Sequence, residues 1–534
     1  MNRKPIFVHN RYLVLPIGKH VNSRKILIWS DDRLVEDFDL RLDYINPCEY
    51  VYYDLKNFFG KTIELAVQPE MEILDRQTSH PLPQSSQSLN YRPRIHFTPK
   101  HGWINDPNGL LEYTSPVTGK KTYHLFYQYN PYDVIWGNMH WGHAISEDLL
   151  HWEELPIALY PDDDGTMFSG SAIIDYENRT GLKQGDEHVI LLYYTCAGHT
   201  SVRSTGKPFI QCLAYSTDGG ITFEKYKNNP VVPHIAEDNR DPKVIWCEEM
   251  GRYLMALYLN DSNFAILVSD DLLHWEHLQN IVIEGEAECP DIYPLQVDGN
   301  PNQRKWILSG ASHLYVVCEY RNGRFEIVQS PRRLHYGRNH YAAQTFSDVS
   351  DGRRIGIAWN RELEFPRAPF YGQMSIPFEL TLRSRKSEYD LCAQPIAQLH
   401  TLNAEASVLR NIEFTAQEPW SMPLLPAAYR IYMDMGHCGN PFTINIFGQD
   451  VSVQPQKNRI QVKNNTVPLA FDDREKRLLI LVDSCSIELF TGDGQAIMTA
   501  PLLCDYNLKR LILSSEHPVR LELLEISRLE HTVH

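Results

Sequence analysis

Three acidic residues that lie far apart in the chain share one local pattern. Asp106 falls within Trp103-Ile-Asn-Asp-Pro-Asn-Gly109, Asp241 within Arg-Asp-Pro, and Glu288 begins Glu-Cys-Pro-Asp, so each precedes a proline by one or two positions. Proline fixes its own φ and keeps the residue before it out of the helical region. Each carboxylate is therefore predicted at a stiff corner where a strand meets a turn. Taken singly, each site is explained by a turn or a structural salt bridge, and this explanation is strong for Arg240-Asp241.

Carboxylates gathered from distant parts of a chain have a defined use in the cleavage of glycosidic bonds. One attacks or stabilises the anomeric carbon, and a second, protonated, donates its proton to the departing oxygen. Like charges in close proximity raise the pKa of one member and keep it protonated near neutral pH. The three sites together therefore favour glycoside chemistry. Cys289, next to Glu288, is interpreted as a small packed residue rather than as a nucleophile.

The elements that would position these carboxylates are predicted to be strands. Short runs rich in Val, Ile, Tyr, Phe and Trp alternate with Asp, Asn, Gly and Pro clusters, which is typical of an antiparallel all-β protein. A degenerate repeat is visible in Ser146–Trp152 and Ser269–Trp275, with a looser copy at Ser216–Phe223. A turn-plus-aromatic marker after each β-run predicts propeller blades. The innermost strands of such blades converge on a central channel, where carboxylates from three blades would meet.

The chain is too long for one ordinary core, and two changes in composition divide it. Residues 1–76 hold about five short β-runs and predict an N-terminal β-module. Residues 77–90 are rich in Pro, Ser and Gln and predict a linker. The propeller is predicted over 91–385. The strong alternation of apolar and polar residues over 400–534 predicts a C-terminal β-sandwich.

Composition excludes several classes of partner. The net charge of −16 argues against nucleic acid and against an anionic membrane surface. The ten cysteines are scattered without metal-binding spacing, and no metal site is predicted. No apolar segment is long enough for a signal peptide or a membrane span, so a cytoplasmic location is expected.

Several further motifs occur in the order found in one enzyme family. His96-Phe-Thr-Pro-Lys-His-Gly102 leads into the Asp106 motif, and Phe126–Pro131, Trp136–His143 and Phe168–Ala172 follow. The chain resembles glycoside hydrolase family 32, the invertase, inulinase and levanase family, over both the propeller and the sandwich. The resemblance implies a five-bladed propeller followed by a β-sandwich. It also implies a retaining hydrolase that releases terminal β-D-fructofuranosyl units, with no metal or organic cofactor.

The resemblance implies roles for individual residues. Asp106 matches the nucleophile, Glu288 the acid/base, and Asp241 the carboxylate that grips fructose hydroxyls and supports the transition state. Seven further positions match residues that line the fructose pocket: Asn105, Gln128, Trp136, Phe168, Ser169, Arg240 and Tyr341.

The sequence departs from the family pattern at several positions. His335 and Asn339 replace two aspartates in a stretch that approaches the pocket, which weakens any transfer of leaving-group specificity and removes two negative charges. A fructosyltransferase and a catalytically inactive fructan-binding protein stay open as alternatives. The preferred fructose-containing substrate also stays open, as does exo against endo action. The N-terminal module could bind sugar, form a homo-oligomer or brace the propeller, and bracing is the default expectation.

Overall fold

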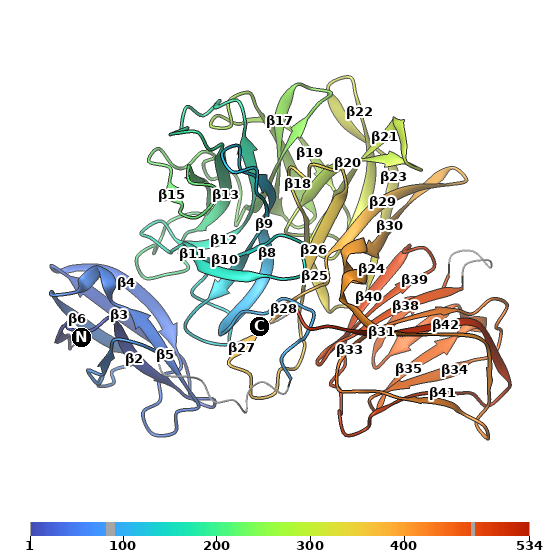
Figure 1. Ribbon diagram of the computed structural model, residues 1–534. Helices are drawn as coiled ribbons and strands as arrows, with labels where there is room; N and C mark the ends of the chain where they lie inside the picture. Colours follow the sequence, from blue (N-terminus) through green and yellow to red (C-terminus); the bar gives the residue numbers. More distant parts are fainter. Residues whose placement is uncertain (1, 82–90, 471–475, 533–534) are drawn as a thin grey trace.

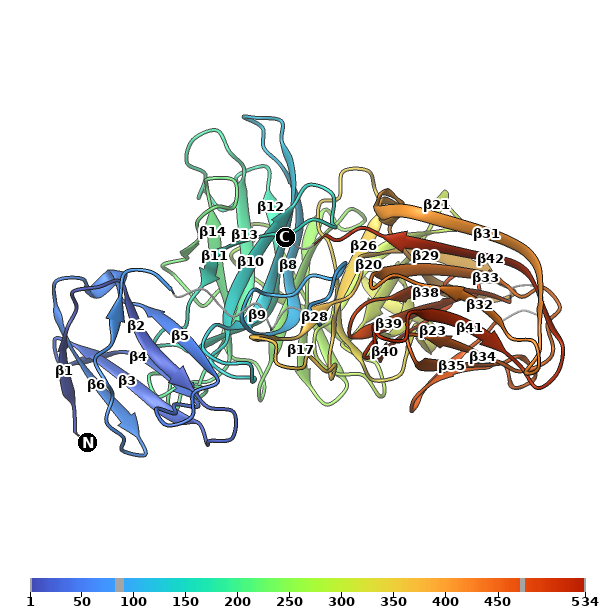
Figure 2. The ribbon, with the colours of Figure 1, turned by 60° about the horizontal axis from the view of Figure 1, so that its bottom comes forward.

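The computed structural model describes residues 2–81, 91–470 and 476–532 and consists almost entirely of β-strands. In this described part, three short 3-10 helices interrupt the strands: η1 (Lys56–Phe58), η3 (Ala397–Leu402) and η4 (Pro455–Lys457). Figures 1 and 2 both show a small N-terminal unit and a larger C-terminal unit on opposite sides of a central propeller. The predicted all-β class is confirmed.

The N-terminal module consists of two sheets packed face to face. One sheet has the order β1-β6-β3-β4 and the other β5-β2-β7. The strands are β1 (Lys4–Phe7), β2 (Tyr12–Ile17), β3 (Arg24–Ser30), β4 (Arg33–Leu40), β5 (Glu49–Asp54), β6 (Thr62–Gln68) and β7 (Gln77–Thr78). The module therefore extends beyond residue 76, because β7 pairs with β2 inside the stretch predicted as linker. Residues 82–90 of that stretch lie outside the described residues.

The propeller strands group into five blades of four antiparallel strands each, as predicted, and a parallel pairing of β20 with β29 joins the last two blades into one nine-stranded sheet. Blade I is β8 (Gly102–Thr114), β9 (Lys121–Asn130), β10 (His140–Ser146) and β11 (Glu153–Leu159); blade II is β12 (Thr166–Asp175), β13 (Val189–Ala197), β14 (Ile210–Ser216) and β15 (Glu224–Lys225); blade III is β16 (Arg240–Cys247), β17 (Arg252–Asn260), β18 (Asn263–Ser269) and β19 (Glu276–Val282). Blade IV is β20 (Asp291–Val297), β21 (Asn300–Ser309), β22 (Leu314–Arg321) and β23 (Arg324–Arg333); blade V is β25 (His340–Thr345), β26 (Arg354–Asn360), β29 (Phe378–Arg385) and β30 (Glu388–Pro395). Two short strands, β27 (Phe370–Tyr371) and β28 (Gln373–Met374), pair with β8 and β26.

Blade V extends the propeller to Pro395, ten residues past the predicted boundary at 385. Strand β30 forms a continuous antiparallel ladder with β29, so the charged stretch near residue 385 is a hairpin turn rather than a domain boundary. The middle strands of the blades are buried on both faces by their neighbours, as in β13, where every residue is buried. Such strands read as continuous apolar runs rather than alternating ones.

The sequence repeat marks the turn between the third and fourth strands of blades I, II and III. The hydroxyl of the first serine accepts a backbone N–H at 2.8 Å from Leu149, at 2.9 Å from Gly220 and at 2.8 Å from Leu272. These three residues have φ of 71°, 84° and 68°, so each is left-handed, and in the second turn Gly219 is left-handed as well, with φ of 73°. The two leucines accept this costly conformation because their side chains are fully buried between blades.

The C-terminal unit is a sandwich of a seven-stranded and a six-stranded sheet. The first has the order β24-β40-β39-β38-β33-β42-β31, and the second β32-β41-β34-β35-β36-β37. Their bounds are β24 (His335–Tyr336), β31 (Asn403–Phe414), β32 (Trp420–Pro423), β33 (Ala428–Asp434), β34 (Phe442–Ile446), β35 (Gln449–Gln454), β36 (Arg459–Val462), β37 (Asn465–Pro468), β38 (Arg477–Val482), β39 (Ser486–Thr491), β40 (Ala496–Pro501), β41 (Arg510–Ser514) and β42 (Val519–Leu529). Strand β24 belongs to the propeller segment of the chain but pairs in parallel with β40.

A buried ionic network joins the sandwich to the segment that leads into blade I. The Nδ1 atom of His96 lies 2.8 Å from Oδ2 of Asp483, and Nε2 lies 3.4 Å from Oε1 of Glu488, with all three side chains at most 4% exposed. Asp483 also accepts the backbone N–H groups of Arg94 and Ile95. Although burial disfavours a charged imidazole, these two carboxylates raise the pKa of His96 to about 9.

Candidate active site

Local irregularities at one end of the five inner strands turn side chains into the central channel. Bulges interrupt β8 between Ile104 and Pro107, β12 between Phe168 and Gly170, β16 between Arg240 and Lys243, and β25 between Tyr341 and Gln344. Just before β20, Glu288 and Cys289 both have positive φ, 54° and 38°. A bulge re-aims a side chain without ending the strand. The predicted corner at Asp106 is therefore a bulged part of the continuous strand β8.

Asp106 is oriented by two side chains. Ser169 Oγ donates to Oδ2 at 2.7 Å, and Asn105 Nδ2 donates to Oδ1 at 3.1 Å. Asn105 is fixed in turn by Trp103 Nε1, which donates to its Oδ1 at 2.9 Å. Burial raises the pKa of Asp106, and the charge of Glu288 adds to this, while the hydrogen bonds from Ser169 and Asn105 oppose it. The predicted residues Asn105 and Ser169 thus both contact the carboxylate.

Cys289 joins two of the carboxylates. Its Sγ lies 3.5 Å from Oδ2 of Asp106 and 3.5 Å from Oδ2 of Asp241, and its backbone N–H donates to the same Asp241 oxygen at 3.0 Å. Burial and the surrounding carboxylates raise the pKa of the thiol far above its usual value. Cys289 therefore acts as a weak S–H donor rather than a thiolate, and its contact with both carboxylates was not predicted.

The backbone of Asp241 has a left-handed conformation, with φ of 65°. Its N–H donates to Thr195 Oγ1 at 2.9 Å, and that hydroxyl donates to Gln211 Oε1 at 2.6 Å. Burial raises the pKa of Asp241 to about 7; Arg240 opposes this, and the charges of Glu288 and Asp106 add to it. Thr195 and Gln211 lie within apolar strand sequences, so nothing in the sequence marked them as supports for a carboxylate.

Glu288 is the most strongly hydrogen-bonded of the three acids. Arg240 Nη2 donates to Oε1 at 2.7 Å, and the Tyr341 hydroxyl donates to Oε2 at 2.5 Å. Burial alone would raise the pKa of Glu288, but these two donors outweigh it and the pKa lies below its usual value. The sequence predicted a raised pKa on the proton donor. In this structure the pKa near neutrality belongs to Asp241, because burial outweighs the opposing charge of Arg240, which forms its close ion pair with Glu288 and lies 3.9 Å from Asp241.

The remaining predicted residues surround this centre at different depths. Trp136 is 56% exposed on the loop between β9 and β10, and its ring meets Phe168 edge-on at 6.1 Å. Gln128 is buried on β9, where its Nε2 lies 3.1 Å from the side-chain amide of Asn108 on β8. Gln128 therefore supports the strand that carries Asp106, whereas Trp136 stands at the rim.

The segment that departs from the family pattern turns toward the sandwich. His335 is buried, stacks on His340 at 4.1 Å, and its Nε2 accepts the backbone N–H of Thr499 on β40 at 2.9 Å. Asn339 donates to the backbone oxygen of Arg361 at 3.0 Å. The stacked imidazoles of His335 and His340 lie where the propeller segment meets the sandwich. Burial lowers the pKa of both imidazoles, so they stay neutral.

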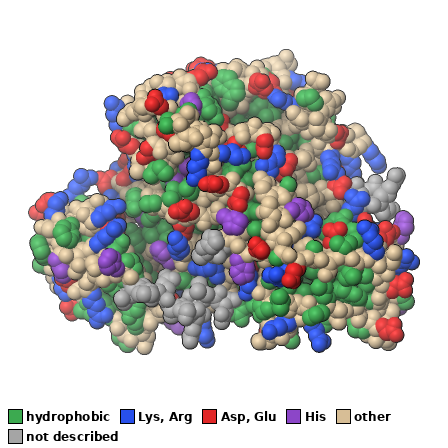
Figure 3. All heavy atoms as spheres, in the orientation of Figure 1, with side chains coloured by type: hydrophobic (Ala, Val, Ile, Leu, Met, Phe, Trp, Pro, Cys, Tyr) green, Lys and Arg blue, Asp and Glu red, His purple; other side chains and the backbone are tan. Residues whose placement is uncertain are grey.

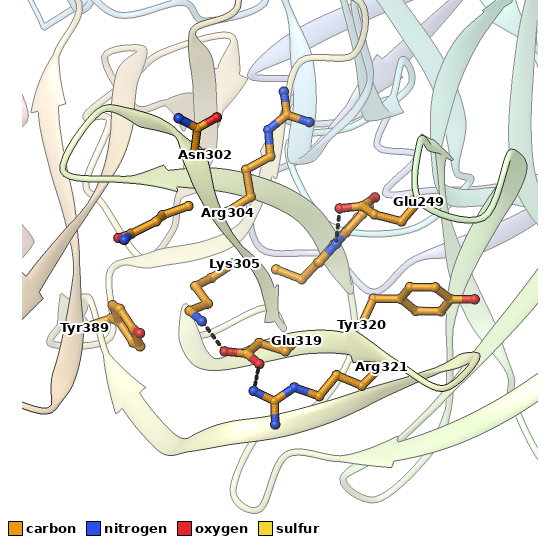
Figure 4. A pocket seen from close by; sticks show the side chains of 10 residues that line it. Glu249, Asn302, Arg304, Lys305, Glu319, Tyr320, Arg321 and Tyr389 are labelled. Carbon is orange, nitrogen blue, oxygen red and sulfur yellow. Dashed lines mark hydrogen bonds and ion pairs between the residues drawn. The ribbon is translucent and has the colours of Figure 1, made fainter.

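A separate hollow of about 490 Å³ lies on the outside of blade IV. Figure 4 shows Lys305 and Arg321 both directed at Glu319, so these three charges are paired with one another. In Figure 3 acidic and basic side chains are interspersed over the visible face. Among the described residues, no cluster of His, Cys, Asp and Glu is arranged to hold a metal ion, and no helix is long and apolar enough to cross a membrane.

Comparisons with known proteins agree with this architecture. The model of the glycosyl hydrolases family 32 N-terminal domain matches residues 96–395. A levanase from Bacillus subtilis is 33% identical over 488 residues, which cover 79% of this chain and 68% of the levanase. An invertase from Schizosaccharomyces pombe is 34% identical over 351 residues, 60% of this chain, and the match spans 57% of that relative's length.

A solved structure gives the same result in three dimensions. The fructofuranosidase from Schwanniomyces occidentalis, solved in complex with fructose, superposes with a TM-score of 0.72 at 26% identity, over 83% of this chain and 99% of that one. The family model covers more than half of the chain and includes Asp106, Asp241 and Glu288. The chain belongs to glycosyl hydrolase family 32 and is a glycosidase.

Proposed function

We propose that this glycosidase releases terminal β-D-fructofuranosyl units from sucrose, fructo-oligosaccharides or fructans with retention of configuration. One observation carries the proposal: side chains from blades I, III and IV meet at one end of the channel. Cys289 contacts both Asp106 and Asp241, and Arg240 contacts both Asp241 and Glu288. The names of the levanase and invertase relatives, and the fructose bound in the related structure, support a fructose-containing substrate.

In the first step Asp106 attacks the anomeric carbon and forms a covalent fructosyl-enzyme. Ser169 and Asn105 each donate to one carboxylate oxygen, so both oxygens are oriented before substrate arrives. Preorganised donors of this kind need no rearrangement at the moment of reaction. Asp241, partly protonated near neutrality, both accepts and donates hydrogen bonds to sugar hydroxyls.

Glu288 delivers a proton to the departing oxygen and later removes one from water. Although burial disfavours it, the ionised form is favoured by the hydrogen bond from Tyr341 and by the ion pair with Arg240, so that ion pair has to open before Glu288 can act as an acid. A substrate hydroxyl that takes over the Nη2 donor of Arg240 accomplishes this. Glu288 then takes up its proton only when the sugar binds. In the empty site, the ion pair with Arg240 keeps Glu288 ionised.

Product analysis of four variants tests the proposal. Asp106→Asn and Glu288→Gln are expected to lower sucrose hydrolysis by at least about 10⁴-fold and 10³-fold. Asp270→Asn, a surface aspartate paired with Arg252, serves as the matched control and keeps full activity. For Glu288→Ala with an activated fructoside, azide restores turnover and gives a β-fructosyl azide. Unchanged sugar release from Asp106→Asn would refute the assigned nucleophile, and an inverted azide product would refute retention.

The substrate panel consists of sucrose, kestose, inulin and levan. Free fructose as the only early product from oligomers indicates exo action. A ladder of shorter oligomers would instead show endo action, and oligomers longer than the substrate would show a fructosyltransferase. If the protein binds sugar but forms no product from any of the four substrates, it is an inactive fructan-binding protein.

A further inference from the structure

The outermost strand of the N-terminal module faces the propeller. Strand β4 ends the sheet order β1-β6-β3-β4, so one side of its backbone has no partner strand in that sheet. The amide of Asn138, from the propeller, fills part of that edge: its Nδ2 donates to the Asp39 oxygen and its Oδ1 accepts the Asp39 N–H, both at 2.8 Å. A side chain thus reproduces the pairing of a neighbouring strand and covers an exposed edge.

The loop that contains Asn138 is anchored to the module at two more points. This loop, residues 131–139, joins β9 to β10 and carries Trp136 at the rim of the site. Asp133, with a side chain 1% exposed, accepts two hydrogen bonds from Arg41, at 2.9 Å from Nε and 2.5 Å from Nη2. Tyr132 inserts into the module core and stacks on Phe38 at 4.3 Å. The anchors lie on both sides of Trp136.

A second rim loop, residues 198–209, is held by the same strand. The carboxylate of Asp37 accepts the backbone N–H of Val202 at 2.7 Å and that of Arg203 at 3.3 Å, and the Arg203 guanidinium lies 3.5 Å away. This loop leads to Phe209. Asp37 and Asp39 of β4 and Arg41, directly after its end, alternate along the chain, so this one segment holds loops from blades I and II.

The two loops meet at an aromatic row beside the nucleophile. Trp136 meets Phe168 at 6.1 Å, and Phe168 meets Phe209 at 5.5 Å, both edge-on. Phe168 precedes Ser169, whose hydroxyl donates to Asp106. The outer members of the row therefore come from the two loops that β4 holds, and the central member adjoins the site.

We propose that the N-terminal module determines substrate affinity by clamping these two loops, so that Trp136 is presented to the sugar in one orientation. Arg41 and Asp37 are positioning residues, since they contact the loops and not Asp106, Asp241 or Glu288. A nine-residue loop without its anchors samples many conformations, and ordering it on binding costs free energy. The clamp removes that cost before the sugar arrives. The effect on catalysis rests on the proposed fructosidase activity, whereas the clamp itself does not.

A double-mutant cycle on sucrose tests the effect on catalysis. Arg41→Ala is expected to raise KM about tenfold and to leave kcat within about twofold, because ordering of the loop precedes chemistry. Trp136→Ala is expected to raise KM at least as much. If Arg41 acts through Trp136, Arg41→Ala has no further effect in the Trp136→Ala background. Additive losses in the double variant, or an unchanged KM for Arg41→Ala, would overturn the proposal.

Hydrogen exchange tests the clamp without reference to activity. Arg41→Ala and Asn138→Ala are each expected to raise amide exchange in residues 131–139 while exchange in the propeller strands stays unchanged. Arg3→Ala is the matched control, because it breaks an ion pair with Glu64 at the opposite edge of the same sheet and leaves the loop protected. Faster exchange throughout the propeller, or no change in the loop in either variant, would overturn the clamp. If the wild type hydrolyses none of the four substrates, the proposed function fails while this measurement still decides the clamp.

Discussion

Replacement of His96 by glutamine is expected to destabilise the joint between propeller and sandwich, and the loss depends on pH. His96 is buried between Asp483 and Glu488, so its removal leaves two buried carboxylates without their cation. Breaking a buried ion pair from one side costs about 3–5 kcal/mol. Below pH 6 the His96→Gln variant should therefore unfold with a free energy lower by about that amount.

The pH dependence follows from the raised pKa of His96. The pKa rises from 6.5 to about 9 on folding, so the folded state binds the proton more tightly than the unfolded chain. The resulting stabilisation is complete below pH 6.5 and is lost progressively as the pH rises to about 9. A pKa difference of this size between the folded and unfolded states corresponds to about 3 kcal/mol of unfolding free energy. The difference in unfolding free energy between wild type and His96→Gln should thus decrease by about 3 kcal/mol between pH 6 and pH 9.5.

Urea unfolding followed by tryptophan fluorescence at the two pH values measures this gap. The control is His274→Gln. Its Nδ1 lies 2.7 Å from Asp271, nearly the same distance as in the buried pair, but the imidazole is 86% exposed. Exposed pairs contribute little, so the control should lie within about 0.5 kcal/mol of wild type at both pH values. A gap between wild type and His96→Gln that stays constant from pH 6 to 9.5 would refute the reasoning.

Three further predictions concern the channel. Asp241→Asn should unfold at a higher urea concentration than wild type at pH 8, because it removes a buried carboxylate whose pKa is raised to about 7. This gain in stability should disappear below about pH 4. An Asp241→Asn variant that is less stable than wild type at pH 8 would contradict the prediction. Ser169→Ala should lower kcat/KM for sucrose by about 10–100-fold through loss of the hydrogen bond to Asp106, and steady-state kinetics with less than twofold change would contradict it. Lys243→Met should lower the unfolding free energy by about 3–5 kcal/mol, because the Lys243 ammonium lies 3.2 Å from the buried Asp291 carboxylate. The double variant Lys243→Met/Asp291→Asn should recover part of this loss. A double variant less stable than Lys243→Met would contradict the prediction.

The sequence predicted the fold class and the blades because both depend on short-range patterns. Strand runs, turn chemistry and the repeated serine turn are local, and in each of the three turns the serine hydroxyl accepts a backbone N–H. The boundary at 385 was wrong because charge and small polar residues mark a hairpin as readily as a linker. Only the ladder between β29 and β30 distinguishes the two.

The site was predictable in its residue types and only partly in its contacts. Proline one or two positions after each carboxylate indicated restricted backbone, and the structure places Asp106 and Asp241 at bulges of inner strands and Glu288 at a left-handed residue just before one. The pairing of Arg240 with Glu288, and the support of Asp241 by Thr195, depend on packing between blades. No sequence window contains both partners, so their electrostatics could not be inferred.

Strand β24 makes the sequence order of the domains a poor guide to where the enzyme can be cut. His335 and Tyr336 are hydrogen-bonded into the sandwich, yet they stand only a few residues before Tyr341, which donates to Glu288. A recombinant propeller that stops near residue 395 would therefore carry an orphaned strand next to its active site. The excised sandwich would expose the freed edge of β40 to other chains. Any chimaera that exchanges C-terminal units between relatives has to exchange this short insert as well.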